Sequence, residues 1–143
     1  MTMMTSEGWR HFTFDELIHS DTADRLGIDN TPTCDATDNL DMLVTRVLDN
    51  LRDGWGRPII VTSGYRCKQL NAAVGGARNS QHLKGQAADI VSGDFEAFRG
   101  FVRRWCKDNE FDQCIFEHSG GRQWIHISYV EGRNRGQVLD LNV

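Results

Sequence analysis

The chain has 143 residues, of which 39 % are hydrophobic and 25 % are charged, and its formal net charge is −4. This length fits one domain with a hydrophobic core over residues 1–143, and the composition excludes a disordered or fibrous protein. The negative charge, with no run rich in lysine and arginine, argues against a nucleic-acid partner, and no stretch approaches the roughly 20 apolar residues of a membrane span. We expect a monomer without a membrane partner.

The N-terminal residues and the cysteines indicate the compartment. Residues 1–11 show no periodicity, so we expect a loose leader there. Residues 1–10 have neither a cationic start nor an apolar segment, so we predict no secretory signal and expect synthesis in the cytoplasm. The cysteines form no C-x-x-C pair, so we expect free and mostly buried thiols (Cys34, Cys67, Cys106 and Cys114).

Two helices are predicted in the first third of the chain. Thr13 and Glu16 have the spacing of a capping box, so a short helix should extend to residue 18. Residues 20–38 are polar, and we expect a long surface loop. Asp38 or Asn39 should then cap the clearest helix of the chain. Its apolar residues recur at the spacing of one buried face (Leu40, Leu43, Val44, Val47, Leu48 and Leu51).

The rest of the chain alternates short β-branched runs with amphipathic stretches. We expect four strands, the first of them buried (residues 59–62, 88–91, 113–117 and 123–129). Helices are expected over residues 68–74 and after Asp94. A glycine pair at positions 120 and 121 is typical of a hairpin turn between the last two strands. These elements predict an α+β fold, with helices packed on a small antiparallel sheet.

A histidine and an aspartate lie on either side of a predicted turn. His82 and Asp89 are seven positions apart, and a straight strand would separate their α-carbons by roughly 23 Å. The backbone must therefore fold back between them to bind one ion, and Gly85 can supply the positive φ of a tight turn. His126, inside a β-rich run, offers a third ligand. Two histidines and one carboxylate leave a position open, as in catalytic zinc sites; hydrogen-bonded histidines and an unrelated aspartate remain the alternative.

The residues around these three ligands resemble a known family. The similarity lies first in two motifs (Ser80-x-His82-x-x-Gly85-x-Ala87-x-Asp89 and Trp124-x-His126-x-Ser128). They are similar to those of the zinc D-Ala-D-Ala carboxypeptidase family, the M15 peptidases of peptidoglycan. Three other segments are similar to landmarks of that family in the same order (residues 12–17, 58–66 and 111–113). The resemblance implies a fold shared with DD-peptidases and hedgehog domains, and zinc bound by His82, Asp89 and His126.

Two residues before the hairpin turn are candidates for the general base that such a peptidase needs. If the glycine pair forms a two-residue turn, Glu117 lies on the face of His126 and His118 points away; one more loop residue would reverse this. In the Glu-x-x-His pattern of related dipeptidases the base lies three residues before the last ligand, but this chain has Gln123 there. We therefore assign the base to Glu117, with an ordinary exposed carboxylate as the alternative.

Arg66 is the candidate for substrate binding. A guanidinium can hold a carboxylate or a peptide carbonyl through two parallel hydrogen bonds, and the resemblance implies that the segment of Arg66 lies beside the metal. A surface ion pair is the alternative. The hydroxyls of Ser80 and Ser128 could orient the ligands, or they could be simple turn and strand hydroxyls.

Together these residues and the resemblance predict a zinc peptidase that hydrolyses D-amino-acid-containing bonds of peptidoglycan stem peptides. It would be a D-Ala-D-Ala carboxypeptidase or a murein endopeptidase; a dipeptidase or an L-Ala-D-Glu endopeptidase is a rival, and the sequence does not select the bond. Because the cell wall lies outside the membrane and no signal is predicted, we expect a phage or prophage endolysin that acts after release. The alternative is a non-catalytic zinc-binding module of a phage structure or for cell-wall targeting, but Glu117 with Arg66 favours catalysis.

Overall fold

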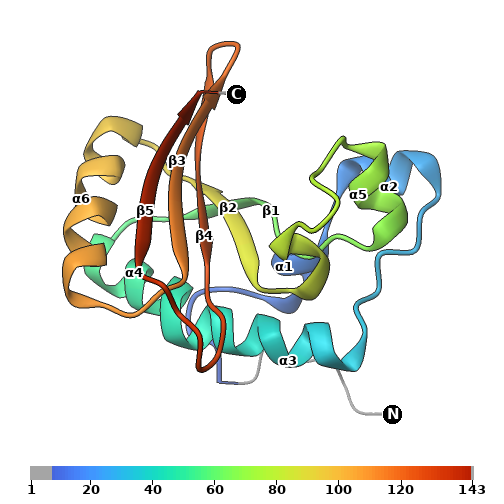
Figure 1. The fold of residues 1–143 in the computed structure, drawn as a ribbon, viewed down its shortest axis with the longest axis horizontal. Helices are drawn as coiled ribbons and strands as arrows, with labels where there is room; N and C mark the ends of the chain where they lie inside the picture. The colour runs from blue at the N-terminus through green and yellow to red at the C-terminus, as the bar shows by residue number, and fades with distance from the viewer. Residues whose placement is uncertain (1–7, 143) are drawn as a thin grey trace.

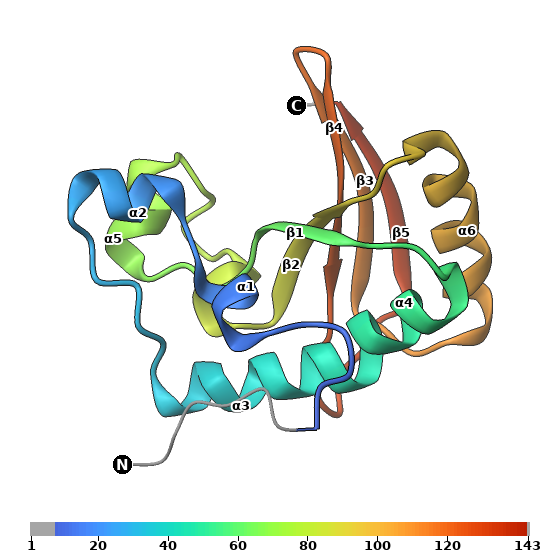
Figure 2. The same ribbon diagram turned by 180° about the vertical axis from the view of Figure 1, so that it is seen from behind.

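The computed structural model describes residues 8–142. The helical segments include one π-helical stretch, η1, and one 3₁₀ turn, η2 (α1 Phe14–Ile18, α2 Asp21–Leu26, α3 Cys34–Leu43, η1 Val44–Leu48, α4 Asp49–Trp55, α5 Lys68–Ala73, η2 Gln81–Lys84 and α6 Phe95–Asp108). The strands form one sheet (β1 Ile60–Ser63, β2 Ala87–Val91, β3 Gln113–Ser119, β4 Arg122–Ser128 and β5 Gln137–Asn142). Figures 1 and 2 show α6 on one side of the strands and α1, α2 and α5 on the other. The predicted α+β class is confirmed.

The strand order in the sheet is β1-β2-β4-β3-β5. Neighbours pair antiparallel from β1 to β3, but β5 pairs with β3 in parallel. The expectation of a purely antiparallel sheet that ends with the hairpin is therefore wrong. After β4 the chain returns to the start of β3, where Gly136 donates to the Phe111 carbonyl and Gln137 to the Asp112 carbonyl, both at 2.9 Å. From that point β5 runs alongside β3 in the same direction.

The two faces of the sheet differ in character because side chains alternate along each strand. One face is apolar and buried (Ala88, Ile90, Cys114, Phe116, Ile125 and Ile127). Helix α6 covers this face, with the guanidinium carbon of Arg103 4.1 Å from the centre of the Phe116 ring. The opposite face carries Asp89, Glu117 and His126 at paired or neighbouring positions. The candidate site therefore lies on the face away from α6.

The predicted long loop over residues 20–38 is wrong, because much of that segment is helical. Ser20 caps α2, its hydroxyl accepting from the amide of Ala23 at 3.1 Å. Thr33, and not Asp38 or Asn39, caps α3 in the same way, accepting from Ala36 at 3.1 Å. The first turns of both helices are mostly exposed and each buries a single alanine (Ala23 and Ala36), so they lack the apolar periodicity that marks a helix in a sequence. The capping box of α1 is confirmed.

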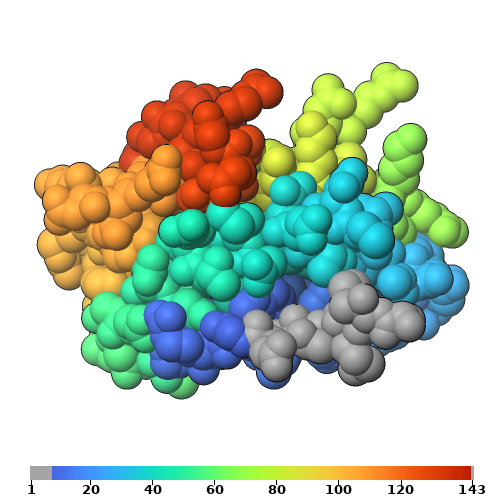
Figure 3. Space-filling view, turned by 90° about the horizontal axis from the view of Figure 1, so that it is seen from below, coloured from blue at the N-terminus to red at the C-terminus, as the bar shows by residue number. Residues whose placement is uncertain are grey.

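The N-terminal segment is held against the long helix. The indole of Trp9 donates to Asp41 at 2.8 Å, and the main-chain amides of Arg10 and His11 donate to the buried carboxylate of Asp49 at 2.9 and 3.0 Å. Figure 3 shows this segment packed along the helix. The prediction of a loose leader is therefore wrong for residues 9–11, and residues 1–7 lie outside the described residues.

Two predictions about burial are also corrected. Ile60 is 57 % exposed, because β1 is an edge strand and not a buried one. Of the cysteines only Cys114 is buried, whereas Cys34 is exposed and the other two are half-buried, so the expectation of mostly buried thiols is wrong. Among the helices of residues 8–142, none has the length and apolar character needed to cross a membrane.

Candidate metal centre

Three elements bring the predicted ligands together. His82 lies in η2, which is capped by Ser80, whose hydroxyl accepts from the amide of His82 at 3.1 Å. Gly85 ends η2 in the left-handed conformation with φ 73°, and a side chain there would lie 2.4 Å from the carbonyl oxygen of Ala36. Glycine is thus needed both for the turn and for the close approach of α3. The chain then enters β2, where Asp89 pairs directly with His126 of β4.

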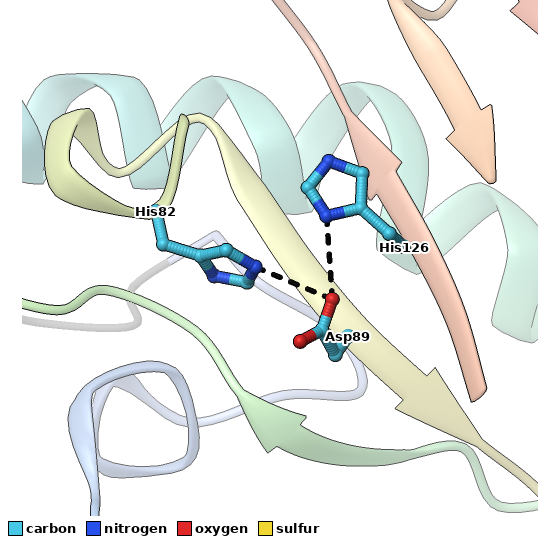
Figure 4. Close-up of side chains that lie close together, drawn as sticks. All are labelled: His82, Asp89 and His126. Carbon is cyan, nitrogen blue, oxygen red and sulfur yellow. Dashed lines mark hydrogen bonds and ion pairs between the residues drawn. The ribbon is translucent and has the colours of Figure 1, made fainter. Parts of the chain in front are cut away.

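The three side chains converge on a single point. His82 Nε2 lies 3.2 Å and His126 Nδ1 lies 3.3 Å from the same oxygen, Oδ1 of Asp89. Figure 4 shows the two imidazoles pointing toward the carboxylate from different sides. The ligand atoms of the three residues all lie within 4.8 Å of one another. His82 is buried, and Asp89 and His126 are each largely shielded from solvent.

In each histidine one ring nitrogen faces Asp89 and the other faces away from it. The hydrogen bond of the nitrogen that faces away determines whether the nitrogen that faces Asp89 can bind a metal. His82 Nδ1 donates to the carbonyl oxygen of Gly64 at 2.7 Å, because that oxygen can only accept. His126 Nε2 lies 3.4 Å from the amide oxygen of Gln81 and donates to it. In a neutral imidazole the other nitrogen then carries a lone pair. Both lone pairs are directed toward the region in front of Asp89.

The charge of Asp89 completes the set. Burial alone would raise the pKa of its carboxyl, but the adjacent imidazoles of His82 and His126 outweigh burial and hold the pKa well below its usual range. An ionised carboxylate and two imidazole lone pairs that face one point are a chemically suitable donor set for a zinc ion, with a coordination position left open. The residues present therefore fit a divalent metal.

A cleft of about 1110 Å³ reaches this centre at Asp89, whereas His82 and His126 are not among its lining residues. The lining also includes the edge strand β1, Leu70 of α5, and the hairpin residues Ser119 and Trp124. The wall that continues through α1 and α2 carries a second cluster of His19, Asp21 and Asp24 with closely spaced ligand atoms. All three are exposed, and exposed acidic groups commonly gather without a metal. The buried centre at the foot of the cleft is thus the better-built site.

Arg66 lies in the cleft beside the metal centre. Its Nη2 is 3.5 Å from the hydroxyl of Ser80, and its buried Nε has no hydrogen-bond partner among the described residues. Burial lowers the pKa of this guanidinium, while the negative charges of Asp89 and Glu117 oppose the shift. A half-buried arginine with an unused donor is unusual in a folded protein, because buried polar groups are normally paired.

The hairpin has the predicted two-residue turn. Ser119 pairs with Arg122 and Glu117 pairs with Trp124, so the expected register is confirmed. Glu117 therefore shares the face of His126. Burial, together with the charge of Asp89, raises the pKa of the Glu117 carboxyl. His118 is exposed on the other face, where it lines a small hollow with Arg99 of α6.

The two serines have different contacts. Ser80 touches the site on two sides, accepting from the His82 amide and lying near Arg66. The buried Ser128 hydroxyl instead accepts from the main-chain amide of Gln113 at 3.0 Å and so joins β4 to the start of β3. Gln81, Gly64 and Asp112, which contact the ligands or their partners, were not among the predicted site residues. The only sequence signal for them is their position inside the motif segments.

Comparison with known proteins places this site in a family. A family model described as peptidase M15 matches residues 10–128. The chain belongs to the peptidase M15 family. The predicted resemblance to the M15 peptidases is therefore confirmed. The matched range contains the three candidate metal ligands, His82, Asp89 and His126. The zinc D-Ala-D-Ala carboxypeptidase of Streptomyces albus G is 43 % identical over 103 residues, which are 68 % of this chain and 39 % of that protein. The chain thus spans well under half of this M15 relative.

Proposed function

We propose that this protein is a zinc peptidase that hydrolyses D-amino-acid-containing bonds of peptidoglycan stem peptides, as a D-Ala-D-Ala carboxypeptidase or a murein endopeptidase. The observation that carries the proposal is the convergence of His82, Asp89 and His126 on one point at the foot of a cleft. Membership of the M15 family and the similarity to a zinc D-Ala-D-Ala carboxypeptidase support it.

In this proposal His82 Nε2, His126 Nδ1 and the Asp89 carboxylate hold the zinc ion. When bound, zinc supplies a Lewis acid that polarises the scissile carbonyl and makes a water molecule more acidic. The hydrogen bonds to Gly64 and Gln81 keep the two imidazoles oriented for this task.

Glu117 is the proposed general base. Its carboxylate takes a proton from the attacking water and returns one to the leaving amine, which requires a group that exists in both protonation states near the working pH. The half-buried position and the nearby charge of Asp89 raise its pKa in the direction that this task needs. His118 points to the other face and takes no part.

Arg66 is proposed to bind the substrate. Its guanidinium lines the cleft and can hold a carboxylate through two parallel hydrogen bonds. In a carboxypeptidase the partner would be the terminal carboxylate of the stem peptide. In an endopeptidase it would be a peptide carbonyl or a side-chain carboxylate.

Mass spectrometry of purified muropeptides after incubation with zinc-loaded protein tests the proposal. Loss of a terminal alanine indicates a carboxypeptidase, and separation of two joined stem peptides indicates an endopeptidase. The His82→Ala variant serves as the control, since it lacks one ligand. Unchanged muropeptides in the presence of zinc-loaded, folded wild-type protein would exclude both activities.

A role in host lysis remains a proposal of its own. An endopeptidase that cuts cross-links weakens the wall, whereas a carboxypeptidase that trims a terminal residue leaves the cross-links intact. A turbidity assay on purified sacculi therefore separates the two. Clearing that depends on zinc supports a lytic enzyme, and stable turbidity despite muropeptide cleavage argues against one.

A further inference from the structure

A chain of hydrogen bonds reaches His126 from outside the metal centre. Arg135, in the loop before β5, donates to the carboxylate of Asp112 from its main-chain amide at 3.0 Å, from Nε at 2.9 Å and from Nη2 at 2.7 Å. The same carboxylate accepts from Nε2 of Gln81 at 2.7 Å. The other end of the Gln81 amide, Oε1, faces His126 Nε2 at 3.4 Å. Arg135, Asp112 and Gln81 thus form one path to a ligand.

In every hydrogen bond of this path, the charge of Asp112 determines which group donates and which accepts. Asp112 is 2 % exposed, and the hydrogen bonds from Arg135 lower the pKa of its carboxyl to about 2. As an ionised carboxylate it can only accept, so Gln81 must turn its NH₂ group toward Asp112. The Gln81 oxygen then faces His126 and can only accept there. His126 must therefore carry its proton on Nε2, which leaves the Nδ1 lone pair for the metal.

We propose that Asp112 and Gln81 are positioning residues that fix the tautomer and ring orientation of His126. This inference rests on the metal site of the proposed function. Partners of this kind, which bind the second nitrogen of a ligating histidine, strengthen metal binding in other proteins. Arg135 lies beyond residues 10–128, the part of the chain that the family model matches. The outer end of the path is thus supplied by a segment that the family match does not include.

Two variants interrupt the path at different points. Gln81→Met keeps a similar volume but removes both the donor and the acceptor. Asp112→Asn keeps the shape but adds an NH₂ group, so the Gln81 amide is free to reverse and to offer a donor to His126. Zinc affinity, measured by competition with a chelator, should fall roughly 10–100-fold in each variant. Nitrogen NMR of the zinc-free proteins should show the proton of the neutral His126 ring on Nε2 in the wild type and, in Asp112→Asn, a fraction of the protein with that proton on Nδ1 instead.

The double variant separates positioning from general damage to the fold. Both residues act through one path. The zinc affinity of the double variant should therefore be about that of the single variant with the lower affinity, and the two fold-losses should not multiply. Gln113→Met is the matched control, since the Gln113 amide donates at 2.7 Å to the exposed Gln137 and not toward the centre. It should bind zinc like the wild type.

The outcomes distinguish this inference from the proposed function. Wild-type protein without stoichiometric zinc would refute the metal site itself. A zinc-loaded wild type with unchanged affinity in Gln81→Met, or with fully additive losses in the double variant, would refute only the positioning role. Should Asp112→Asn fail to fold, the affinity of Gln81→Met and the proton position on His126 in that variant decide the question, because Gln81 is only half-buried.

Discussion

Gly64 connects the fold to the metal centre, and a methyl group added to it should disturb both. A Cβ at this position would lie 2.1 Å from the carbonyl oxygen of Leu17. An ordinary carbon–oxygen contact is about 3.3–3.6 Å, so α1 and the loop would have to separate by about 1.2 Å. The Leu17 oxygen accepts from the amide of Tyr65 at 2.8 Å, and the Gly64 oxygen accepts from His82 Nδ1 at 2.7 Å. Both hydrogen bonds must therefore lengthen or break.

The size of the effect in Gly64→Ala follows from these contacts. Losing the main-chain hydrogen bond costs about 1 kcal/mol, and overpacking costs roughly 1–3 kcal/mol, so the free energy of unfolding should fall by about 2–4 kcal/mol. The displaced acceptor of His82 should weaken zinc binding roughly 10–100-fold. Urea denaturation of the zinc-free protein measures the first effect, and chelator competition measures the second.

Gly93→Ala provides the matched control. No heavy atom lies within 4 Å of the Cβ that this variant would add, and its backbone is not in the left-handed region. Its free energy of unfolding should stay within about 0.5 kcal/mol of the wild type. If Gly64→Ala were as stable as Gly93→Ala and bound zinc as tightly, the close packing of the loop on α1 and its support of His82 would both be refuted.

Three further predictions concern the site residues. His82→Ala should remove most of the zinc, because the two remaining ligands hold the ion weakly; elemental analysis of gently purified protein measures this, and normal zinc content would overturn the assignment. Arg66→Lys keeps the charge but loses the second parallel hydrogen bond, so kcat/KM on stem peptides should fall while zinc content stays normal, and unchanged kinetics would make Arg66 a structural residue. Glu117→Gln should bind zinc and lose roughly 10²–10⁴-fold in rate, whereas His118→Ala should stay active; the reverse result would assign the base to His118.

The hairpin and the ligands were predictable because their information is local. Two glycines between β-rich runs indicate a two-residue turn, and the turn length alone determines which side chains share a face. The parity that places Glu117 beside His126 thus follows from a few neighbouring residues. The turn between His82 and Asp89 is local in the same sense, because a seven-residue separation leaves the backbone few ways to return.

The errors fall where long-range contacts decide the structure. Strand β5 is an exposed edge whose polar and apolar residues carry little signal, and it is placed by the pairing of Gln137 with the Asp112 carbonyl. The N-terminal segment likewise has no periodicity of its own, but it packs because Asp49, buried in the long helix, needs donors. In both cases the partner lies more than 20 residues away, so no window of the sequence contains the reason.

The same distinction explains why the candidate metal ligands could be picked out from the sequence and the residues that support them could not. A histidine or an aspartate at a characteristic spacing indicates metal chemistry by its side-chain type alone. A glutamine such as Gln81 carries no such signal, since its amide can face either way until its partners are known. Asp112 determines that orientation only because the loop before β5 brings Arg135 against it. The candidate donor set of this centre is therefore a property of short motifs, whereas the protonation pattern that we propose for His126 is a property of the complete fold.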